Sequence, residues 1–226
     1  MGSATMVTLE ASGQALMLLP EKAIFLPDSD TLLVADAHIG KAVSFRRLGV
    51  PVPQGTTDET LQALTALIEQ HGAARVIFLG DLLHSARVQG SATLDAFGRW
   101  RARHAGVELL LVRGNHDQRA GDPPPVLGVI CVDEPFSLPG SAGLALCHHP
   151  EPRAGVYVLA GHAHPCVQIG RGMDRLRLAC FHLGSQVGVL PAFGAFTGMQ
   201  AIVRAPADRV FVVADNGVHA LPPTPP

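Results

Sequence analysis

Short apolar runs that stop abruptly at polar residues recur along the chain. Buried strands of an α/β fold show this pattern, because both faces of such a strand are covered. The runs predict strands at Thr31–Ala35, Arg75–Leu79, Val107–Val112, Leu144–Cys147 and Val156–Ala160. Apolar residues at helical spacing predict helices over Thr57–His71 and Thr93–His104. Strand and helix therefore alternate through the first half of the chain.

The pattern changes after Arg175. The segments Leu176–Leu183, Met199–Arg204 and Val210–Ala214 are strand-like with little helical periodicity, and they predict a second sheet. No repeat or linker divides the sequence, so we expect one domain over residues 1–226 with a frayed, proline-rich tail at 221–226.

Composition limits the classes of function. The 226 residues are 47% hydrophobic and carry a formal net charge of -2, so a sizeable core is expected, without an overall field that attracts nucleic acid or membrane. No run approaches the roughly 20 apolar residues that cross a bilayer, and no signal peptide opens the chain, so we expect a cytoplasmic protein. The four cysteines form no CxxC pair and predict reduced core thiols.

Polar residues suited to metals follow the first two predicted strands. Asp36 and His38, two apart at a strand end, can face one metal, although a cap of the next turn is the alternative for Asp36. After the second strand, Asp81 offers two carboxylate oxygens, one for each of two cations about 4 Å apart. His84 is a candidate substrate contact, with a surface imidazole as the alternative.

The third predicted strand is followed by Gly114-Asn115-His116-Asp117. Asn115 is a neutral oxygen ligand, His116 can donate a proton, and Asp117 can orient the His116 ring. A turn built on Gly-Asn is the alternative, but it does not explain the His-Asp pair.

Histidines follow the last two predicted strands. His148 and His149 end one of them, and His162 and His164 end the other, so imidazoles can reach neighbouring metals from each loop. Any single histidine could be a satisfied core residue. Five strand ends that carry such residues in sequence favour a metal centre.

These motifs resemble the calcineurin-like metallophosphoesterase superfamily, whose pattern is D-x-H, G-D, G-N-H-D/E, H and G-H-x-H in this order. The match spans most of the chain. A closer resemblance, to the ligase-associated DNA damage response endonucleases called PdeM, rests on Gly40-Lys41, the segment from Phe45 to Pro53, GDLLHS at 80–85 and LPAFGAFTG at 190–198. The resemblance implies a metallophosphoesterase-type αββα sandwich of two mixed β-sheets flanked by helices.

The resemblance also implies seven ligands for two divalent metal ions at the strand ends. Asp36, His38 and His164 would hold one metal, Asn115, His148 and His162 the other, and Asp81 would bridge them. His148 is preferred to His149 because family members usually place the ligand two residues before the proline, and His149 stays open as the alternative. The mixed donor set suits Mn²⁺, with Zn²⁺ or Fe as alternatives.

The implied function is a Mn²⁺-dependent phosphodiesterase that acts as a single-stranded DNA endonuclease in DNA repair. Two cations sharing a hydroxide would attack the phosphodiester in line, and His116, supported by Asp117, would protonate the leaving oxygen. Functional association with an ATP-dependent DNA ligase, a helicase and an exonuclease is implied by the family setting. A phosphatase or cyclic-nucleotide phosphodiesterase is the alternative, and a non-catalytic scaffold is disfavoured because no ligand is missing.

Several cations lie close to the motifs in sequence. Lys41 and Arg46 are the candidate contacts with the phosphodiester backbone, and His149 is a further candidate. Arg47, Arg87 and Arg113 lie near the same motifs, and ordinary surface charge is the alternative for all of them. With one Trp and one Tyr in the chain, we expect contacts to the backbone rather than stacking on bases.

Overall fold

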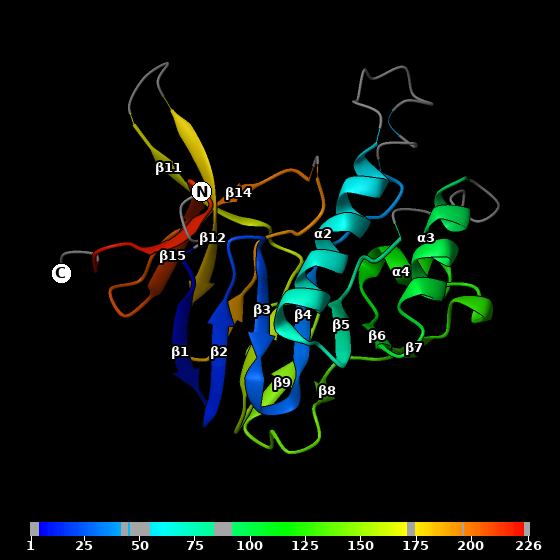
Figure 1. Cartoon of the computed structure of the whole chain (residues 1–226). Coiled ribbons are helices and arrows are strands. Elements are labelled where there is room, and N and C mark those ends of the chain that lie inside the picture. The colour runs from blue at the N-terminus through cyan, green and yellow to red at the C-terminus, as the bar shows by residue number, and fades with distance from the viewer. Residues whose placement is uncertain are drawn as a thin grey trace.

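The computed structural model describes residues 5–41, 45, 55–83, 92–170, 175–195 and 197–223. Two mixed sheets pack face to face, and helices flank the sandwich (Figure 1). This architecture confirms the fold class that the sequence predicts. Among the described residues, no helix is both long and apolar enough to cross a membrane.

The first sheet has seven strands in sequence order. Its first four strands pair antiparallel and its last four pair parallel, with β4 common to both halves. The strands are β1 Val7–Ala11, β2 Gln14–Leu18, β3 Ala23–Leu26, β4 Thr31–Ala35, β5 Arg75–Leu79, β6 Glu108–Val112 and β7 Val129–Val132.

The second sheet is built from the rest of the chain. Its order is β14-β11-β12-β13-β10-β9-β8, and β15 and β16 extend it from β12. At its centre, β10 pairs parallel with both β9 and β13. The strands are β8 Phe136–Ser137, β9 Leu144–Leu146, β10 Tyr157–Ala160, β11 Pro165–Ile169, β12 Leu176–Leu183, β13 Val187–Val189, β14 Gln200–Ala201, β15 Arg209–Ala214 and β16 Gly217–Ala220.

Alternation along β5 shows how the first sheet is covered on both faces. Val76 and Phe78 belong to the apolar cluster that contains the buried face of α2 (Thr56–His71) and α3 (Ala92–Arg103). Ile77 and Leu79 point the other way and join the core between the two sheets. Both faces are buried, so the strand reads as a continuous apolar run.

Short elements complete the fold. Helix α4 (Asn115–Ala120) starts directly after β6, and two 3₁₀ turns, η1 (Pro27–Ser29) and η3 (Pro125–Leu127), lie in loops. The predicted strand at Met199–Arg204 is wrong beyond the two residues of β14, because this segment lies at the sheet edge and Val203 is 91% exposed. Residues 221–223 carry no regular structure, and 224–226 lie outside the described residues.

Parallel pairing positions the candidate site. The strands β4, β5 and β6 run in the same direction, so the polar residues that follow them meet at one edge of the first sheet. The strands β9 and β10 do the same in the second sheet. The residues that sequence analysis singled out therefore come from the carboxyl ends of strands in both layers.

Candidate metal centre

The loops after β4 and β5 run side by side. The backbone N–H of His38 donates to the carbonyl of Asp81 at 2.9 Å, and that of Ile39 donates to the carbonyl of Leu82 at 2.8 Å. These bonds fix the relative position of Asp36 and Asp81, the two carboxylates, which are 0% and 3% exposed. Both acids are thus buried at the edge where the sheets meet.

One group of potential ligands gathers around Asp36. The ligand atoms of Asp36, His38 and His164 lie within 4.8 Å of one another. His164 Nδ1 donates to the carbonyl of Gly198 at 2.8 Å, so the lone pair of the neutral ring is on Nε2. This Nε2 lies 3.5 Å from Asp36 Oδ1. Among the described residues, the buried Asp36 Oδ1 accepts no hydrogen bond, so its surroundings fit a cation.

A second group gathers around His148, which is completely buried. Its Nδ1 lies 3.1 Å from the carbonyl of Leu79, so this nitrogen carries the proton and Nε2 presents a lone pair. That Nε2 lies 3.0 Å from Asn115 Oδ1 and 3.0 Å from His162 Nδ1. Converging acceptor atoms of this kind fit a shared cation.

Asp81 lies between the two groups. Its Oδ2 is 3.9 Å from His38 Nε2 in the first group, and its Oδ1 is 3.7 Å from His148 Nε2 in the second. The structure thus brings together all seven residues that the resemblance assigns as ligands. Their division between two metals stays a prediction.

The protonation of the histidines depends on their neighbours. Burial lowers the pKa of His162, and the nearby His148 and His149 lower it further, which favours the neutral ring that binds metals. Burial also acts against the charged form of His164, but the Asp36 carboxylate outweighs it and raises the pKa of that ring.

His116 lies beside Asp81 and is partly exposed to solvent. Its side chain is 37% exposed, and its Nε2 lies 3.9 Å from Asp81 Oδ2. Its backbone N–H donates to Asp81 Oδ1 at 3.0 Å. The ring is therefore held beside the potential ligands while it remains accessible to a substrate.

The carboxylate of Asp117 accepts hydrogen bonds from three backbone N–H groups. Its Oδ2 accepts the N–H groups of Asp81 at 2.7 Å and Gly114 at 2.9 Å, and its Oδ1 accepts that of Leu82 at 3.1 Å. Burial raises the pKa of Asp117, and the hydrogen bond from Gly114 opposes this effect. Asp117 thus fixes the loops after β5 and β6, whereas its predicted hold on the His116 ring stays a prediction.

Glu134 is a supporting residue that sequence analysis missed. It lies more than ten residues before the histidines and follows no motif. One carboxylate oxygen accepts the N–H groups of His148 at 2.7 Å and His149 at 2.9 Å, and the other lies 2.7 Å from His149 Nδ1. This geometry favours His148 as the ligand, because the His149 ring is committed to Glu134. A ligand atom of His149 nevertheless lies within 4.8 Å of ligand atoms of His148 and His162, so His149 stays open as the alternative.

A segment that crosses the strand ends links the two sheets. We call residues 190–195 the crossing segment. Leu190 donates to Ala160 at the end of β10, at 2.8 Å, and Phe193 donates to Ala35 at the end of β4, at 2.8 Å. Phe193 packs in the apolar cluster that also contains the buried faces of α2 and α3, whereas Phe196 lies outside the described residues.

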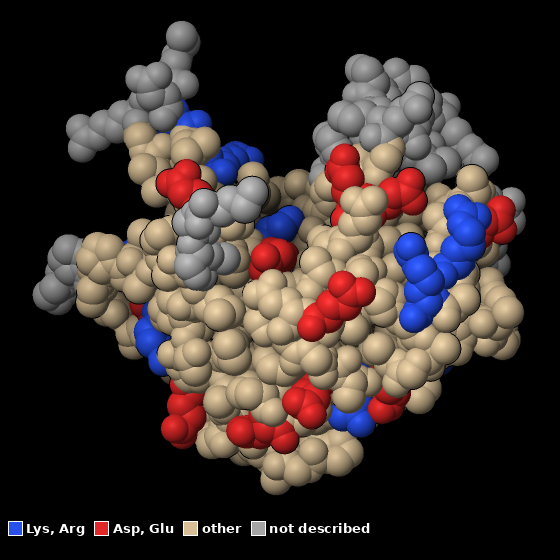
Figure 2. Space-filling view, viewed as in Figure 1, with Lys and Arg blue, Asp and Glu red and all other residues tan. Residues whose placement is uncertain are grey.

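Only some of the candidate substrate contacts lie among the described residues. Lys41 lines a small cleft with His38 and the first turn of α2. Burial lowers the pKa of Lys41, and the carboxylates of Asp36 and Asp81 oppose this effect. Figure 2 shows acidic and basic side chains interspersed over the described part of one face, without one large basic patch. The residues Arg46, Arg47, His84 and Arg87 lie outside the described residues.

The guanidinium of Arg113 is paired with two acidic side chains. It forms ion pairs with Asp122 at 2.7 Å and Asp133 at 2.9 Å, and the hydrogen bonds that its guanidinium donates to Asp122 raise the arginine pKa. These ion pairs favour the alternative of an ordinary surface charge, and a contact between Arg113 and the substrate stays a prediction.

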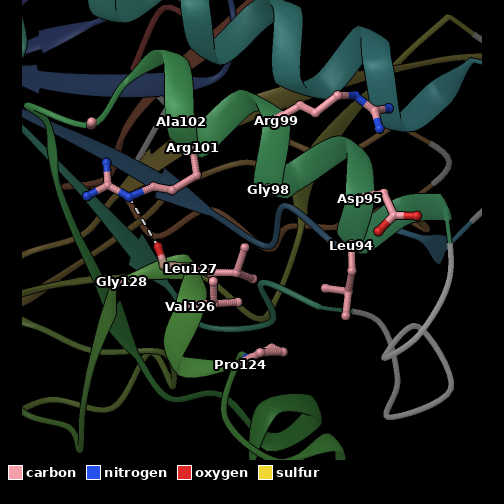
Figure 3. A pocket seen from close by; sticks show the side chains of 11 residues that line it. Leu94, Asp95, Gly98, Arg99, Arg101, Ala102, Pro124, Val126, Leu127 and Gly128 are labelled. Atoms are coloured by element: carbon pink, nitrogen blue, oxygen red, sulfur yellow. Dashed lines mark hydrogen bonds between the residues drawn. The ribbon is translucent and has the colours of Figure 1, made fainter.

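An apolar cavity lies away from this chemistry. It has a volume of about 810 Å³ between α3 and η3, and Leu94, Val126 and Leu127 contribute much of its apolar wall (Figure 3). Arg101 donates to the carbonyl of Leu127 across one end of it. None of the seven potential ligands lines this cavity, so the candidate active site is the metal centre.

Residues 30–164, more than half of the chain, match the family model of calcineurin-like phosphoesterases. The chain belongs to this family. The crystal structure of Pseudomonas putida nuclease MPE is 43% identical, with a TM-score of 0.84, over 96% of this chain and 100% of that one. Membership of the family that the motifs resemble is therefore confirmed, and one structure similar to this chain is that of a nuclease.

More distant structures add no argument. Yfce, a phosphoesterase from E. coli, is 17% identical with a TM-score of 0.41 over 82% of this chain and 88% of its own. A conserved uncharacterized protein from Streptococcus pneumoniae, described as a predicted phosphoesterase, is 13% identical with a TM-score of 0.34 over 82% and 83%. A comparison with curated proteins finds no match.

Gly80 permits the close approach of the His148 ring. A Cβ built at Gly80 would overlap this ring, and φ is +79°. Gly155 has a φ of +78° but open space around its Cβ position. Gly155→Ala therefore strains the backbone as Gly80→Ala does, but causes no steric overlap. We expect Gly80→Ala to weaken Mn²⁺ binding by roughly 10- to 100-fold, measured by calorimetric titration, and Gly155→Ala to leave it unchanged. Equal affinities in the two variants would show that the overlap is relieved without moving His148.

Replacing Asp117 tests its role as a backbone acceptor. Asp117→Asn turns one acceptor oxygen into a donor, so at least one buried backbone N–H loses its partner. We expect the free energy of unfolding to fall by about 1–3 kcal/mol in urea denaturation. The exposed ion pair of Asp122 provides the matched control, because Asp122→Asn should cost less than about 1 kcal/mol. A similar small loss in both variants would contradict the assigned role.

Proposed function

We propose that this protein is a metal-dependent phosphodiesterase, with Mn²⁺ as its metal, that cuts single-stranded DNA internally in DNA repair. The observation that carries the proposal is the convergence of two groups of ligands on Asp81, at the strand ends of both sheets. The similarity to a nuclease over 96% of the chain supports a phosphodiester as the substrate class.

The donor set supports a pair of divalent metals. Buried carboxylates, an amide oxygen and neutral imidazoles together suit Mn²⁺. The first metal would be held by Asp36, His38 and His164, the second by Asn115, His148 and His162, and both by Asp81. Bound divalent cations offset charge on phosphoryl oxygens and make water nucleophilic at neutral pH.

The chain's own residues carry the other parts of the mechanism. His116 would give a proton to the leaving oxygen, because its accessible ring lies beside the ligands and its backbone is fixed by Asp81. Lys41 would contact a phosphate, since it lines the cleft beside His38. Asp117 would act as a positioning residue that keeps the ligand loops in place.

Single-stranded DNA is the proposed substrate and partner. Its support is the nuclease similarity and the resemblance to the ligase-associated endonucleases, which also underlies the proposed association with a DNA ligase, a helicase and an exonuclease. A phosphatase or a cyclic-nucleotide phosphodiesterase would use the same centre on smaller esters, so substrate tests separate these activities.

Circular single-stranded DNA tests the endonuclease proposal, because it offers no end to an exonuclease. We expect the full-length protein with Mn²⁺ to convert the circle to linear and shorter products on a denaturing gel. Asp81→Ala should bind less metal, measured by elemental analysis, and should lose cleavage, because Asp81 connects both groups of ligands. Hydrolysis of phosphate monoesters or cyclic nucleotides with intact circles would instead favour the smaller-ester activities.

A His116→Ala variant tests the proton donor. A nucleoside alkoxide needs a proton to leave, whereas a nitrophenolate does not, so DNA cleavage should fall roughly 10²- to 10⁴-fold while hydrolysis of a bis-nitrophenyl phosphate falls much less. The ratio of the two kcat/KM losses is the measurement. If both substrates lose the same factor, His116 does not act as the acid.

A further inference from the structure

The two lysines of this chain both lie beside the metal centre. All of the other basic residues are arginines, so Lys22 and Lys41 are the only lysines in the sequence. Lys41 lines the cleft at His38, and Lys22 lines a cavity of about 200 Å³ at His164. Ala195, in the crossing segment, borders both spaces. Both lysines therefore line spaces that this segment borders.

Lys22 comes from the turn between β2 and β3, far from every metal-ligand motif. The turn is closed by backbone bonds from Leu19 to Ala23 at 2.9 Å and from Lys22 to Leu19 at 3.0 Å. The φ of Lys22 is +68°, a conformation that favours glycine or asparagine. A lysine at this position is therefore not explained by the needs of the turn.

The Lys22 ammonium is largely buried and only partly satisfied. Its Nζ donates to the carbonyl of Phe193 at 2.9 Å, which uses one of its three N–H groups. No carboxylate among the described residues lies within ion-pair distance of it. A buried cation without a counter-ion is costly, and an anion in the adjoining cavity would relieve that cost.

The cavity has the size and lining for such an anion. Small residues, Gly194 and Ala195 among them, leave the space open, and Thr197 also lines it while its hydroxyl donates to the carbonyl of Gly194 at 3.2 Å. One wall is the ring of His164, whose Nε2 faces Asp36. A group bound here would lie next to the metal centre rather than in it.

We propose that Lys22 and the cavity beside His164 bind a phosphodiester group of the DNA strand next to the one that is cleaved. This inference rests on the proposed function and deepens it, because it gives the site a reason to prefer a polymer over a small ester. The ammonium supplies a charge-assisted contact that carries no base information, as expected for sequence-independent binding.

A purely structural role is the competing explanation. Lys22 bonds to Phe193 in the crossing segment, and the chain that follows leads to Gly198, whose carbonyl orients His164. If Lys22 acted only through this connection, its loss would change metal binding and cleavage of every substrate alike. A contact with a neighbouring phosphate would instead make the effect of Lys22 depend on the charge of that phosphate.

A double-mutant cycle, with one change in the protein and one in the DNA, tests the contact between Lys22 and the neighbouring phosphate. Short oligothymidylates with one cleavable linkage would carry either a normal phosphodiester or a neutral methylphosphonate at the neighbouring linkage. For the wild type, we expect the methylphosphonate on one side to raise KM roughly tenfold, the size typical of one lost charge-assisted hydrogen bond. In Lys22→Met the same replacement should have no further effect, and Lys22→Arg should restore the wild-type response.

Arg103→Met is the matched control for lost positive charge. Arg103 is exposed at the C-terminal end of α3, and that end precedes β6, opposite the edge that carries the ligands. This variant should respond to the methylphosphonate as the wild type does. A Lys22→Met enzyme that keeps the wild-type response would overturn the proposal. A loss of Mn²⁺ affinity that accounts for the whole effect of Lys22→Met would assign it to positioning instead.

A second measurement keeps the inference separate from the endonuclease proposal. Biosynthetic labelling with ¹³Cε-lysine marks both lysines and leaves their ammonium groups unchanged, and the signal of Lys22 is identified by its absence in Lys22→Arg. Dimethyl phosphate, added to the full-length protein with Mg²⁺, should shift the Lys22 signal saturably. Intact circular DNA combined with this shift would overturn the endonuclease proposal alone, whereas an unshifted Lys22 signal would overturn the anion site.

Discussion

Two buried carboxylates approach each other where the sheets meet, and the site is organised around this constraint. Asp36 and Asp81 each follow one of two adjacent parallel strands, and each is almost completely buried. Like charges in such a place are stable only when cations and hydrogen-bond donors surround them. The backbone N–H groups of His162 and His116 each donate to one of these acids, at 2.8 and 3.0 Å, and the imidazoles complete a centre suited to divalent metals.

The close approach requires unusual backbone conformations. Five potential ligands have positive φ between 44° and 67°, a region that costs non-glycine residues roughly 1 kcal/mol or more each. These are Asp36, His38, Asp81, His162 and His164. Glycines at the same strand ends leave room for the neighbouring rings and carboxylates. The continuous core above and below the first sheet, together with the bonds of Asp117, holds these loops in place.

Support for the centre comes from parts of the chain that carry no recognisable motif. Glu134 holds the loop of His148 and His149, and the carbonyl of Gly198 orients His164. The crossing segment bonds to the ends of both β4 and β10, so it joins the two sheets directly at the site. Lys22 is bonded to this same segment.

The sequence by itself determined the strands β4, β5 and β6 of the first sheet, the two long helices, the family and the residues able to bind metal at the strand ends, whereas β1, β2, β3 and β7 were not predicted. These features follow from local periodicity and from residue types at fixed spacing, which the chain displays without folding. Only the tertiary structure showed that Glu134 holds the loop of His148 and His149, bonded Asp117 to three backbone N–H groups, paired Arg113 with acids and placed Lys22 in a cavity beside His164. Each of these depends on contacts between residues distant in sequence, because a side chain's partner is set by packing of the two sheets and not by its neighbours along the chain.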